Sequence, residues 1–558
     1  MHIIMNNNDF ITATPESVGI PSVAITKFIR SLQKYSLCMH GILIFRRGKL
    51  VAEGYAPPYH AERKHRMYSI SKSFTALGIG LLAEEGKISL GDRIVDHYPE
   101  YVPGPVHPFI ADATIRDMLT MRDCHDTTLA GLSDWFSTPP THPPGTVFMY
   151  NTTCTNLLCG IVEKISGVTL MEYLYPRLLA PIGFTPGCVC IKGSWGYSWS
   201  GSGILCAPRD LARVALLCMN GGSWGGKQLI GERFIREAVS RQVDNAIGND
   251  DAEHQAGYGY QIWRTRFDGF AFLGMGSQLA VAAPDRDLLL VTTADTQDVA
   301  GASGMIIRTF FETVAASLSD GSLPEDAVAQ AGLEKALGGL ELVTAPGTPF
   351  SPVADKISGK TYRLFDSFCG WRDVRFEFAD NGGGESGESG DGSGGGGSGN
   401  GGWRSIGNGG GGNGGGENNG GIGGGNDGRS AGYGGGRNAG KSGGRSAGKS
   451  GGRIVYSNRR GDNKEIPFGF GAQERFSFPE THYPGLELGK PAGRGYEAHA
   501  SAGWVDERTL SILCYITDDY CGSLRINAVF DGNRVTLFLK KTAEFFLDDY
   551  EGWCYGYC

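Results

Sequence analysis

The stretch Tyr68-Ser69-Ile70-Ser71-Lys72 opens the run YSISKSFTALGIGLLAEEG, whose apolar residues recur at helical spacing. This run predicts a buried helix with Ser69 in its first turn, where unpaired backbone N–H groups and the helix dipole favour negative charge. Lys72 follows three residues later, so its amine is a surface neighbour of the Ser69 hydroxyl on a helix. Apolar surroundings are expected to lower the pKa of the Lys72 amine, which makes it a candidate general base for Ser69.

The pattern Ser-x-x-Lys is common by chance, and a helix with a capping serine and a solvated lysine would carry the same residues. Its surroundings favour the catalytic interpretation. Two short apolar runs, residues 40–45 and 49–53, flank Arg46-Arg47-Gly48 and predict a β-hairpin upstream of the helix. Two strands followed by a buried helix that carries Ser69 predict a packed α/β core.

The bulk composition points to a multidomain globular protein. A chain of 558 residues is too long for one ordinary hydrophobic core. A net charge of −8 offers no basic field for nucleic acid or an anionic membrane. The N-terminal run MHIIMNNNDFITATPESVGI lacks the pattern of a secretory signal, and no run approaches the length of a transmembrane helix. We therefore expect a soluble, cytoplasmic protein that acts on a small molecule.

The metal-binding and redox residues predict no cofactor. Thirteen cysteines are scattered along the chain, so reduced thiols are favoured over a disulfide framework. No paired C-x-x-C pattern and no H-E-x-x-H motif occurs among the cysteines and the 11 histidines, and His60 and His65 are expected in loops. Neither a metal ion nor another cofactor is expected, and the oligomeric state is left open.

Helical and strand patterns alternate over the first part of the chain. This part, residues 1–325, is predicted to be one catalytic domain, followed by a linker over 326–347. A hairpin is expected over residues 278–294, with an apolar helix after it. Strands at both ends of this part predict one sheet assembled from both ends, flanked by helices. Helices are expected over residues 23–35, 69–85, 114–120, 151–165, 208–219 and 301–317.

Residues 381–453 are about half glycine and predict a disordered insert, because such a segment buries too little apolar surface to offset its ordering entropy. Two repeats, GGRNAGKS and GGRSAGKS, satisfy the P-loop pattern, but no strand precedes them and no helix follows. They are interpreted as low-complexity expansion. Residues 348–380 and 454–558 alternate like strands and predict one C-terminal β domain interrupted by the insert, which is tolerable because loop-closure entropy grows slowly with length.

Two further segments could complete a site around Ser69. The segment PPGTVFMYNT presents Tyr150 and Asn151 before a helix, and Tyr150 could move a proton between Ser69 and a leaving group if a nearby ammonium favours its phenolate. A packed tyrosine without such a role is equally compatible with this segment. The segment LGMGSQ places Gly274 and Gly276 before a strand, where a backbone N–H could approach a substrate, although an ordinary tight turn has the same pattern.

Together these segments resemble the serine β-lactamase-like superfamily, which includes class C β-lactamases, D,D-peptidases, and related esterases and amidases. The resemblance covers about residues 15–318 and includes YSISKSFT, ATIRDMLTMRD, PPGTVFMYNTTCTNLLCGIVEKISG, GSGILCAPRDLARVALLCMNGG and LGMGSQLAVAAPDRDLLLV. It implies an α/β (α+β) fold, an antiparallel sheet flanked by helices plus a helical subdomain. It also implies Ser69 as acylated nucleophile, Lys72 as base, Tyr150 as acid/base partner, and the backbone N–H groups of Ser69 and Met275 as oxyanion hole.

The substrate site is expected to include Asn151, Gly274, Gly276 and Gln278. Two departures from the superfamily pattern bear on the substrate. Gly274-Met275-Gly276 stands where β-lactamases and D,D-peptidases carry Lys/His-Thr/Ser-Gly, so the cation that recognises a carboxylate is missing. Tyr150-Asn151-Thr152 differs from the commoner Tyr-x-Asn, which leaves open whether Thr152 replaces the usual asparagine.

We therefore expect a serine hydrolase that cleaves a small ester or amide through a Ser69 acyl-enzyme. One alternative is a β-lactamase or D,D-peptidase in which Gly274-Met275-Gly276 is an atypical form of the Lys/His-Thr/Ser-Gly motif. Another is a ligand-binding or sensor protein that keeps the pocket without turnover. The natural substrate is not readable from the sequence, because specificity depends on loops.

Overall fold

The computed structural model of the chain describes most of the two predicted domains. The glycine-rich residues 381–448 lie outside it, so their disorder stays a prediction. The described residues are 10–102, 104–129, 131–246, 251–266, 268–365, 367–380, 449–480, 496–518, 521–542 and 550–558.

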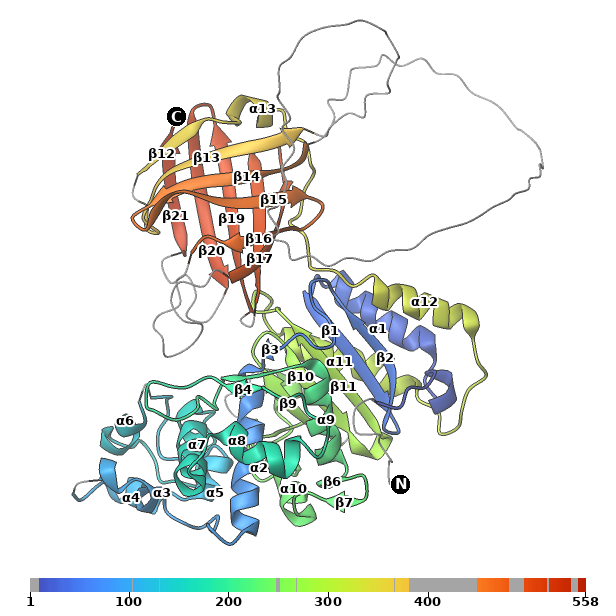
Figure 1. Ribbon diagram of the computed structural model, residues 1–558, viewed down its shortest axis with the longest axis vertical. Helices are drawn as coiled ribbons and strands as arrows, with labels where there is room; N and C mark the ends of the chain where they lie inside the picture. Colours follow the sequence, from blue (N-terminus) through green and yellow to red (C-terminus); the bar gives the residue numbers. More distant parts are fainter. Residues whose placement is uncertain are drawn as a thin grey trace, which may run out of the picture. The chain divides into compact units, whose positions relative to one another are not determined.

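An antiparallel sheet in the order β2-β1-β11-β10-β9-β8 forms the centre of the first domain (Figure 1). The hairpin β1–β2 comes from the start of the domain and β10–β11 from its end. They meet through β1 and β11, with Ile42 opposite Thr292. The sheet is therefore assembled from both sequence ends, as predicted. The strands are β1 (Met39–Arg46), β2 (Lys49–Tyr55), β8 (Trp263–Arg264), β9 (Phe270–Gly274), β10 (Gln278–Ala283) and β11 (Leu288–Ala294).

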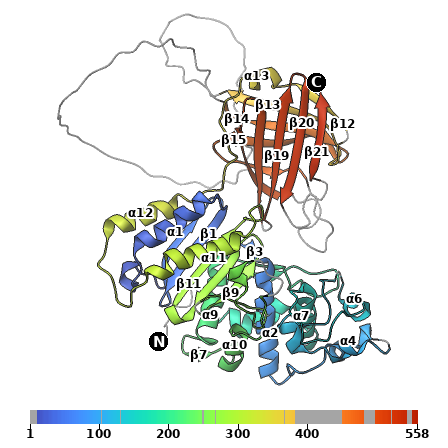
Figure 2. The ribbon, with the colours of Figure 1, turned by 180° about the vertical axis from the view of Figure 1, so that it is seen from behind.

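Helices cover both faces of this sheet, which explains why all eight residues of β1 are buried. Successive side chains of a strand point to opposite faces. Ile42 and Ile44 accordingly join the core under α1 and α11, whereas Leu43 and Phe45 join the core that contains α2 and α9. Figure 2 shows α1, α11 and α12 on one side of the sheet. These helices are α1 (Ser22–Lys34), α2 (Ser71–Glu84), α9 (Pro208–Met219), α11 (Ala302–Thr313) and α12 (Ala327–Gly338).

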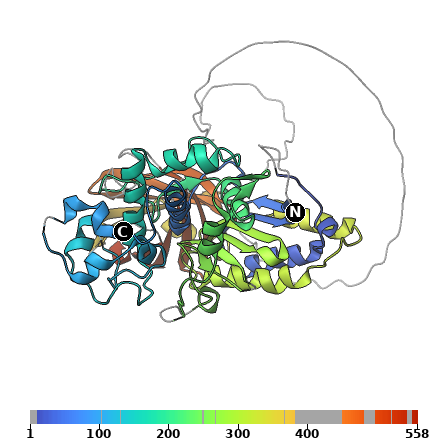
Figure 3. The ribbon, with the colours of Figure 1, turned by 90° about the horizontal axis from the view of Figure 1, so that it is seen from below.

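A helical region lies beside the sheet and packs around α2, seen in blue to teal in Figure 3. Its helices are α3 (Ile94–His97), α4 (Pro108–Asp112), α5 (Ile115–Leu119), α6 (Leu132–Ser137), α7 (Thr152–Ser166) and α8 (Leu170–Leu174). The remaining elements of the domain are η1 (Glu16–Val18), β3 (His65–Arg66), η2 (Tyr68–Ile70), η3 (Pro99–Tyr101), η4 (Tyr175–Leu179), β4 (Val189–Cys190), β5 (Ile204–Cys206), β6 (Ser223–Trp224), β7 (Lys227–Gln228), α10 (Glu232–Val239), η5 (Ala252–His254), η6 (Pro284–Arg286) and η7 (Ala315–Ser317).

Residues 326–347, interpreted from the sequence as a linker, contain helix α12. This helix packs on α1 and β2, and it adds Leu333 to the core under α1, as does Leu340 after its end. Asp326 caps its N-terminus by accepting a hydrogen bond from Ala329 N. Most of this segment is therefore packed structure of the first domain, and the predicted boundary at residue 325 cuts it off from the sheet that it covers.

The C-terminal domain is a β domain, as predicted, with one short helix, α13, before its first strand. Its strands follow the order β15-β14-β13-β12-β21-β20-β19-β18-β17-β16, and β15 also pairs with β17, which closes the sheet on itself. Trp371 stacks on Tyr456 in its core with ring centroids 4.0 Å apart. The elements are α13 (Ala354–Ile357), β12 (Thr361–Phe365), β13 (Trp371–Asp380), β14 (Lys449–Asn458), β15 (Gly461–Phe470), β16 (Glu474–Phe478), β17 (Tyr496–Trp504), β18 (Thr509–Thr517), β19 (Cys521–Asp531), β20 (Arg534–Thr542) and β21 (Gly552–Tyr557).

Strand β14 begins at Lys449, inside the segment 381–453 that was predicted to be disordered. Gly451 and Gly452 pair with Gly469 and Phe468 of β15. The start of β14 is as rich in glycine as the insert, so the sequence does not separate the two, and only the pairing with β15 does. The predicted boundary at residue 453 is thus wrong by several residues.

Among the described residues, no helix combines the length and the apolar character needed to cross a membrane. All 13 cysteines lie in the described part of the chain, and none is joined in a disulfide.

Candidate active site

Ser69 lies in the short turn η2, directly before helix α2. Two hydrogen bonds tie this turn to β5: Met67 N donates to Ile204 O at 2.8 Å, and Ile204 N donates to Ser71 Oγ at 3.0 Å. Tyr68 has a φ of 48°, in the left-handed region that costs a bulky L-residue roughly 1–2 kcal/mol. The structure therefore holds a strained residue immediately before the predicted nucleophile.

Contacts from two sides hold Tyr68, which is only 1% exposed. The Arg66 guanidinium carbon lies 4.6 Å from the centroid of the Tyr68 ring. The Tyr68 hydroxyl donates to Cys521 O, a backbone carbonyl of the C-terminal domain, at 3.1 Å. No sequence pattern predicted this contact, which joins the C-terminal domain to the residue next to Ser69.

The structure brings Lys72 to Ser69, as the spacing on the helix predicted. Lys72 Nζ donates to Ser69 Oγ at 3.0 Å and to Gly201 O at 2.6 Å. The lysine is 1% exposed, whereas Ser69 is half-buried and so reachable from solvent. The amine is thus positioned to accept the Ser69 proton when it is neutral.

Tyr150 approaches Ser69 from the segment before α7. Its ring centroid lies 5.0 Å from Lys72 Nζ, the amine that is hydrogen-bonded to Ser69. Burial raises the pKa of Tyr150, and the nearby Ser69 hydroxyl offsets this only in part. Tyr150 is therefore a neutral phenol at neutral pH, which suits a proton donor better than a resting phenolate. Its ring packs against Trp263, with centroids 5.3 Å apart.

The turn between β9 and β10 lies next to η2. A Cβ built on Gly274 would come 2.3 Å from Met67 O and 3.3 Å from Ile70 Cγ1, so only glycine lets β9 approach the Ser69 turn this closely. Gly276 has a φ of 74°, which also favours glycine. Met275 follows Gly274 directly and is 39% exposed. This placement supports the proposal that the Met275 N–H is an oxyanion donor.

We expect Gly274→Ala to disturb both the fold and the site, because the new methyl group meets a backbone oxygen that has no rotamer to change. The unfolding free energy should fall by about 1–3 kcal/mol. Displacing the Met275 N–H by about 1 Å should lower kcat roughly 100-fold. Thermal melting and initial rates measure the two effects.

The matched control is Gly332→Ala in α12, where a Cβ would meet no atom within 4 Å. Alanine inside a helix is more stable than glycine by about 0.5–1 kcal/mol, so this variant should melt slightly higher and keep its rate. A Gly274→Ala protein that behaves like the control would disprove the close approach of β9.

Asn151 lies beside Tyr150, but hydrogen bonds inside the protein occupy its amide. Its Nδ2 donates to Asp123 Oδ2 and to Thr127 O, both at 3.1 Å, and its Oδ1 accepts from Thr153 N at 2.9 Å. The side chain is 1% exposed and caps α7. A substrate contact for Asn151 stays a prediction, and these bonds disfavour it while they place Tyr150.

Gln278 is fully buried and braces the β9–β10 turn. Its Nε2 donates to Ala294 O at 2.6 Å and to Met275 O at 3.2 Å, and its Oε1 accepts from Ala294 N at 3.2 Å. We propose that Gln278 positions the Met275 peptide group rather than touching the substrate.

Sequence reasoning missed Gly201, which binds Lys72, and Asn156, which binds Gly201. Gly201 supplies the carbonyl that binds the Lys72 amine, and its own N–H donates to Asn156 Oδ1 at 3.0 Å. Gly201 lies in GSGILC, a segment quoted above for its resemblance only. The signal available was its glycine: a Cβ there would come 2.3 Å from Thr152 Cγ2.

Comparison with known proteins agrees with this fold. The family model described as Beta-lactamase matches residues 8–303, more than half of the chain.

Two curated relatives match parts of this region. The chain is 23% identical over 254 residues to the 6-aminohexanoate-dimer hydrolase of Paenarthrobacter ureafaciens, covering 41% of this chain and 64% of that protein. It is 25% identical over 179 residues to the protein flp of Staphylococcus aureus (strain COL), covering 28% of this chain and 35% of that protein. The chain thus spans less than two thirds of the length of either relative.

A solved structure, the penicillin binding protein from Bacillus halodurans, superposes with a TM-score of 0.39 at 20% identity, covering 51% of this chain and 98% of that one. The octameric penicillin-binding protein homologue from Pyrococcus abyssi gives a TM-score of 0.41 at 13% identity, covering 96% of this chain and 99% of that one.

Proposed function

The chain belongs to the beta-lactamase family, and we propose that it is a serine hydrolase which cleaves a small ester or amide through an acyl-enzyme on Ser69. One observation carries this proposal: Lys72 Nζ donates to Ser69 Oγ at 3.0 Å, and the Tyr150 ring lies 5.0 Å from the same amine. A nucleophile in contact with both a base and an acid is the arrangement that acyl transfer requires.

In the acylation step, the neutral amine of Lys72 takes the Ser69 proton while Oγ attacks the substrate carbonyl. The backbone N–H groups of Ser69 and Met275 stabilise the oxyanion of the tetrahedral intermediate. Tyr150 then donates its phenolic proton to the leaving group. The Lys72 ammonium, 5.0 Å from the Tyr150 ring, stabilises the phenolate that results.

Deacylation runs the same proton transfers with water. The Tyr150 phenolate takes one proton from a water molecule, whose oxygen attacks the acyl carbon. When the second intermediate collapses, Lys72 returns its proton to Ser69 Oγ as the acid product leaves. Lys72 and Tyr150 thereby both regain their starting protonation states without a cofactor.

The segment between β9 and β10 bears on the class of substrate. Gly274-Met275-Gly276 carries no side-chain cation to pair with a β-lactam or peptide carboxylate. This favours an ester or a linear amide over a β-lactam. A curated relative is named for the hydrolysis of 6-aminohexanoate dimer, so a linear amide of this kind belongs among the substrates to test.

The test is a substrate panel with the purified full-length protein: p-nitrophenyl butyrate, 6-aminohexanoate dimer, D-amino-acid amides and a chromogenic cephalosporin. Turnover of the ester or an amide, with a Ser69-linked acyl group detected by mass spectrometry, supports the proposal. Rapid turnover of the cephalosporin alone would replace it with a β-lactamase. Stoichiometric labelling of Ser69 without turnover of any substrate would favour a binding or sensor protein.

Replacing Tyr150 with phenylalanine is expected to lower kcat for an amide about 100- to 1,000-fold, because the leaving amine loses its proton donor. The ring keeps its packing against Trp263, so the melting temperature should change little. For an ester with a good leaving group such as p-nitrophenolate the loss should be smaller, since that group departs without protonation.

A suitable control is Tyr197→Phe, which removes the hydroxyl of a partly buried tyrosine outside the site. Its rates should stay within about twofold, the range expected of a surface change. Equal losses for amide and activated ester in Tyr150→Phe would argue against an acid role for Tyr150.

A further inference from the structure

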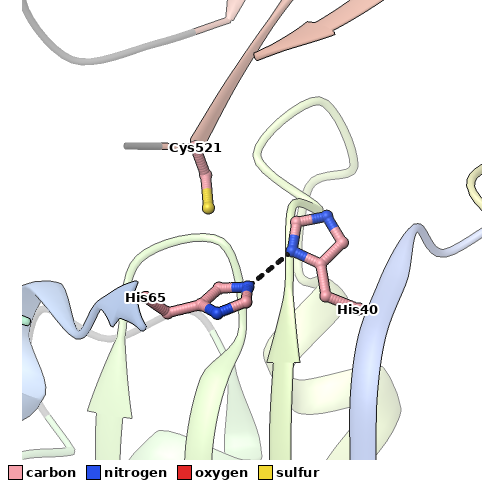
Figure 4. Close-up of side chains that lie close together, drawn as sticks. All are labelled: His40, His65 and Cys521. Carbon is pink, nitrogen blue, oxygen red and sulfur yellow. Dashed lines mark hydrogen bonds between the residues drawn. The ribbon is translucent and has the colours of Figure 1, made fainter. Parts of the chain in front are cut away.

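A cluster of two histidines and a cysteine lies where the first domain meets β19 of the C-terminal domain. His40 comes from β1, His65 from β3, and Cys521 opens β19. Figure 4 shows the two rings and the thiol facing one another. His40 Nδ1 and His65 Nε2 are 3.0 Å apart, and one ligand atom from each of the three residues lies within 4.8 Å of the others.

This cluster is closed to solvent. His40 and His65 are each 1% exposed, and Cys521 is 4% exposed. The Tyr59 ring stacks on His40 with centroids 3.9 Å apart and lies 4.6 Å from His65, which fixes both rings. Burial lowers the pKa of His65 to about 3 and lowers that of His40 well below its ordinary value. Both imidazoles are therefore neutral at neutral pH, the form that offers a lone pair to a metal ion.

His65 presents one ring nitrogen to His40 and buries the other. Its Nε2 faces His40 Nδ1, and its buried Nδ1 has no hydrogen-bond partner among the described residues. The nearby Arg63 backbone partly offsets the effect of burial on the pKa of this ring.

We propose that His40, His65 and Cys521 bind one zinc ion, with the fourth position open to water. Two imidazole nitrogens and one thiolate are ligands that zinc prefers. Tetrahedral zinc separates two nitrogen ligands by about 3.3 Å and a nitrogen from a sulfur ligand by about 3.6 Å. The observed cluster needs shifts of only about 1 Å to reach these distances.

Binding is coupled to loss of the Cys521 proton. Burial raises the pKa of the Cys521 thiol well above its ordinary value, Asp295 and Cys38 add to this effect, and Arg66 and Arg63 oppose it to a smaller extent. Zn²⁺ replaces the S–H bond by a Zn–S bond and releases the proton to solvent, so no oxidant or reductant is required. Zinc affinity should accordingly rise with pH.

Sequence reasoning predicted no metal ligand and placed His65 in a loop. In the structure His65 belongs to β3, which pairs with β5. His40 precedes it by 25 residues, and Cys521 comes from the other domain. Zinc motifs are recognised from closely spaced ligands, and this set has no such spacing.

The site has a consequence for the nucleophile. The carbonyl of Cys521 accepts the hydrogen bond from Tyr68, the strained residue next to Ser69. A zinc ion on the Cys521 thiolate would fix this carbonyl by holding β19 to β1 and β3. Zinc would thus act as a structural clamp, and its presence does not depend on the proposed hydrolase activity.

The test begins with the full-length protein purified without chelator. We expect about one zinc per chain by elemental analysis, or uptake of one equivalent on titration with zinc chloride. Removal of the metal and addition of Co²⁺ should give the thiolate-to-cobalt charge-transfer absorption and the visible bands of tetrahedral cobalt. Less than a tenth of an equivalent after titration would overturn the proposal and leave a buried histidine pair.

Cys521→Ser should lose at least ten-fold in zinc affinity and lose the thiolate-to-cobalt absorption. The matched control is Cys514→Ser, which alters an equally buried thiol of the same domain in β18 and should keep both. If Cys521→Ser does not fold, the cobalt spectrum of the unchanged protein still decides the question. A spectrum without thiolate bands, or uptake of copper with no uptake of zinc, would overturn the proposal.

Discussion

Replacement of Ser69 by alanine is expected to lower kcat/KM for the best substrate by about four to six orders of magnitude. By the conversion of about 1.4 kcal/mol per factor of ten, this is roughly 5–8 kcal/mol of transition-state stabilisation. The loss is this large because without Oγ no acyl-enzyme forms, and the base and the oxyanion donors have no covalent step to assist. The folded state should be preserved, since Ser69 is half-buried and alanine fits its turn.

Three measurements check this expectation. Initial rates give the loss, mass spectrometry after incubation with an activated ester should show no added acyl group, and a fluorophosphonate probe should no longer label the protein. The matched control is Ser73→Ala, in helix α2, four residues after Ser69. Ser73 Oγ donates to Gln261 O at 2.8 Å, so this variant should lose about 1 kcal/mol of stability and keep its rate within about twofold.

A Ser69→Ala protein that keeps more than a tenth of the wild-type rate would refute the acyl-enzyme mechanism. Retained labelling by the fluorophosphonate probe would point to another nucleophile.

Lys72→Arg should lower kcat/KM by about three to four orders of magnitude, within the range of general base catalysis together with activation of the nucleophile. The guanidinium keeps the positive charge but cannot give up a proton at accessible pH, so it cannot accept the Ser69 proton. If Lys72 served only as a fixed charge, arginine would retain much of the activity. The substitution therefore separates a base from an electrostatic role.

The Lys72 experiment has two further arms. In Lys72→Ala, a small primary amine added to the buffer should restore part of the rate, and the rescued rate should rise with pH as the free amine becomes neutral. Lys87→Arg provides the control, because Lys87 is 41% exposed and forms an ion pair with Glu85 near the end of the same helix. A Lys72→Arg protein within tenfold of the wild type would exclude the base role.

The parts of the site that the sequence predicted are those set by local spacing. Ser69 lies in η2 and Lys72 in α2, which follows directly, so a spacing of three residues along helical backbone brings Nζ to Oγ. The central sheet was also predictable. The sequence shows one hairpin at each end of the first domain, and these two hairpins join through β1 and β11.

What the sequence did not predict depends on contacts between distant segments. Gly201 binds Lys72 from 129 residues away. It does so through its backbone carbonyl, which every residue has, so its residue type does not reveal this contact. Helix α12 shows little apolar periodicity in the sequence, which agrees with its packing: among its residues only Leu333 is buried. Strand β14 starts in glycine-rich sequence, where partner and register decide the structure and composition does not.

The bond between Tyr68 and Cys521 has a consequence for the order of events during synthesis. During synthesis, the Tyr68 hydroxyl can form this bond only after Cys521, 453 residues later in the chain, has left the ribosome. At roughly 5–20 residues per second this delay is about 20–90 s. A nascent first domain can therefore fold its sheet and helices while its Ser69 turn still lacks one of its supports. We expect full hydrolytic activity to appear only after β19 has been translated and Cys521 has reached Tyr68, so that activity of a nascent chain reports on this contact.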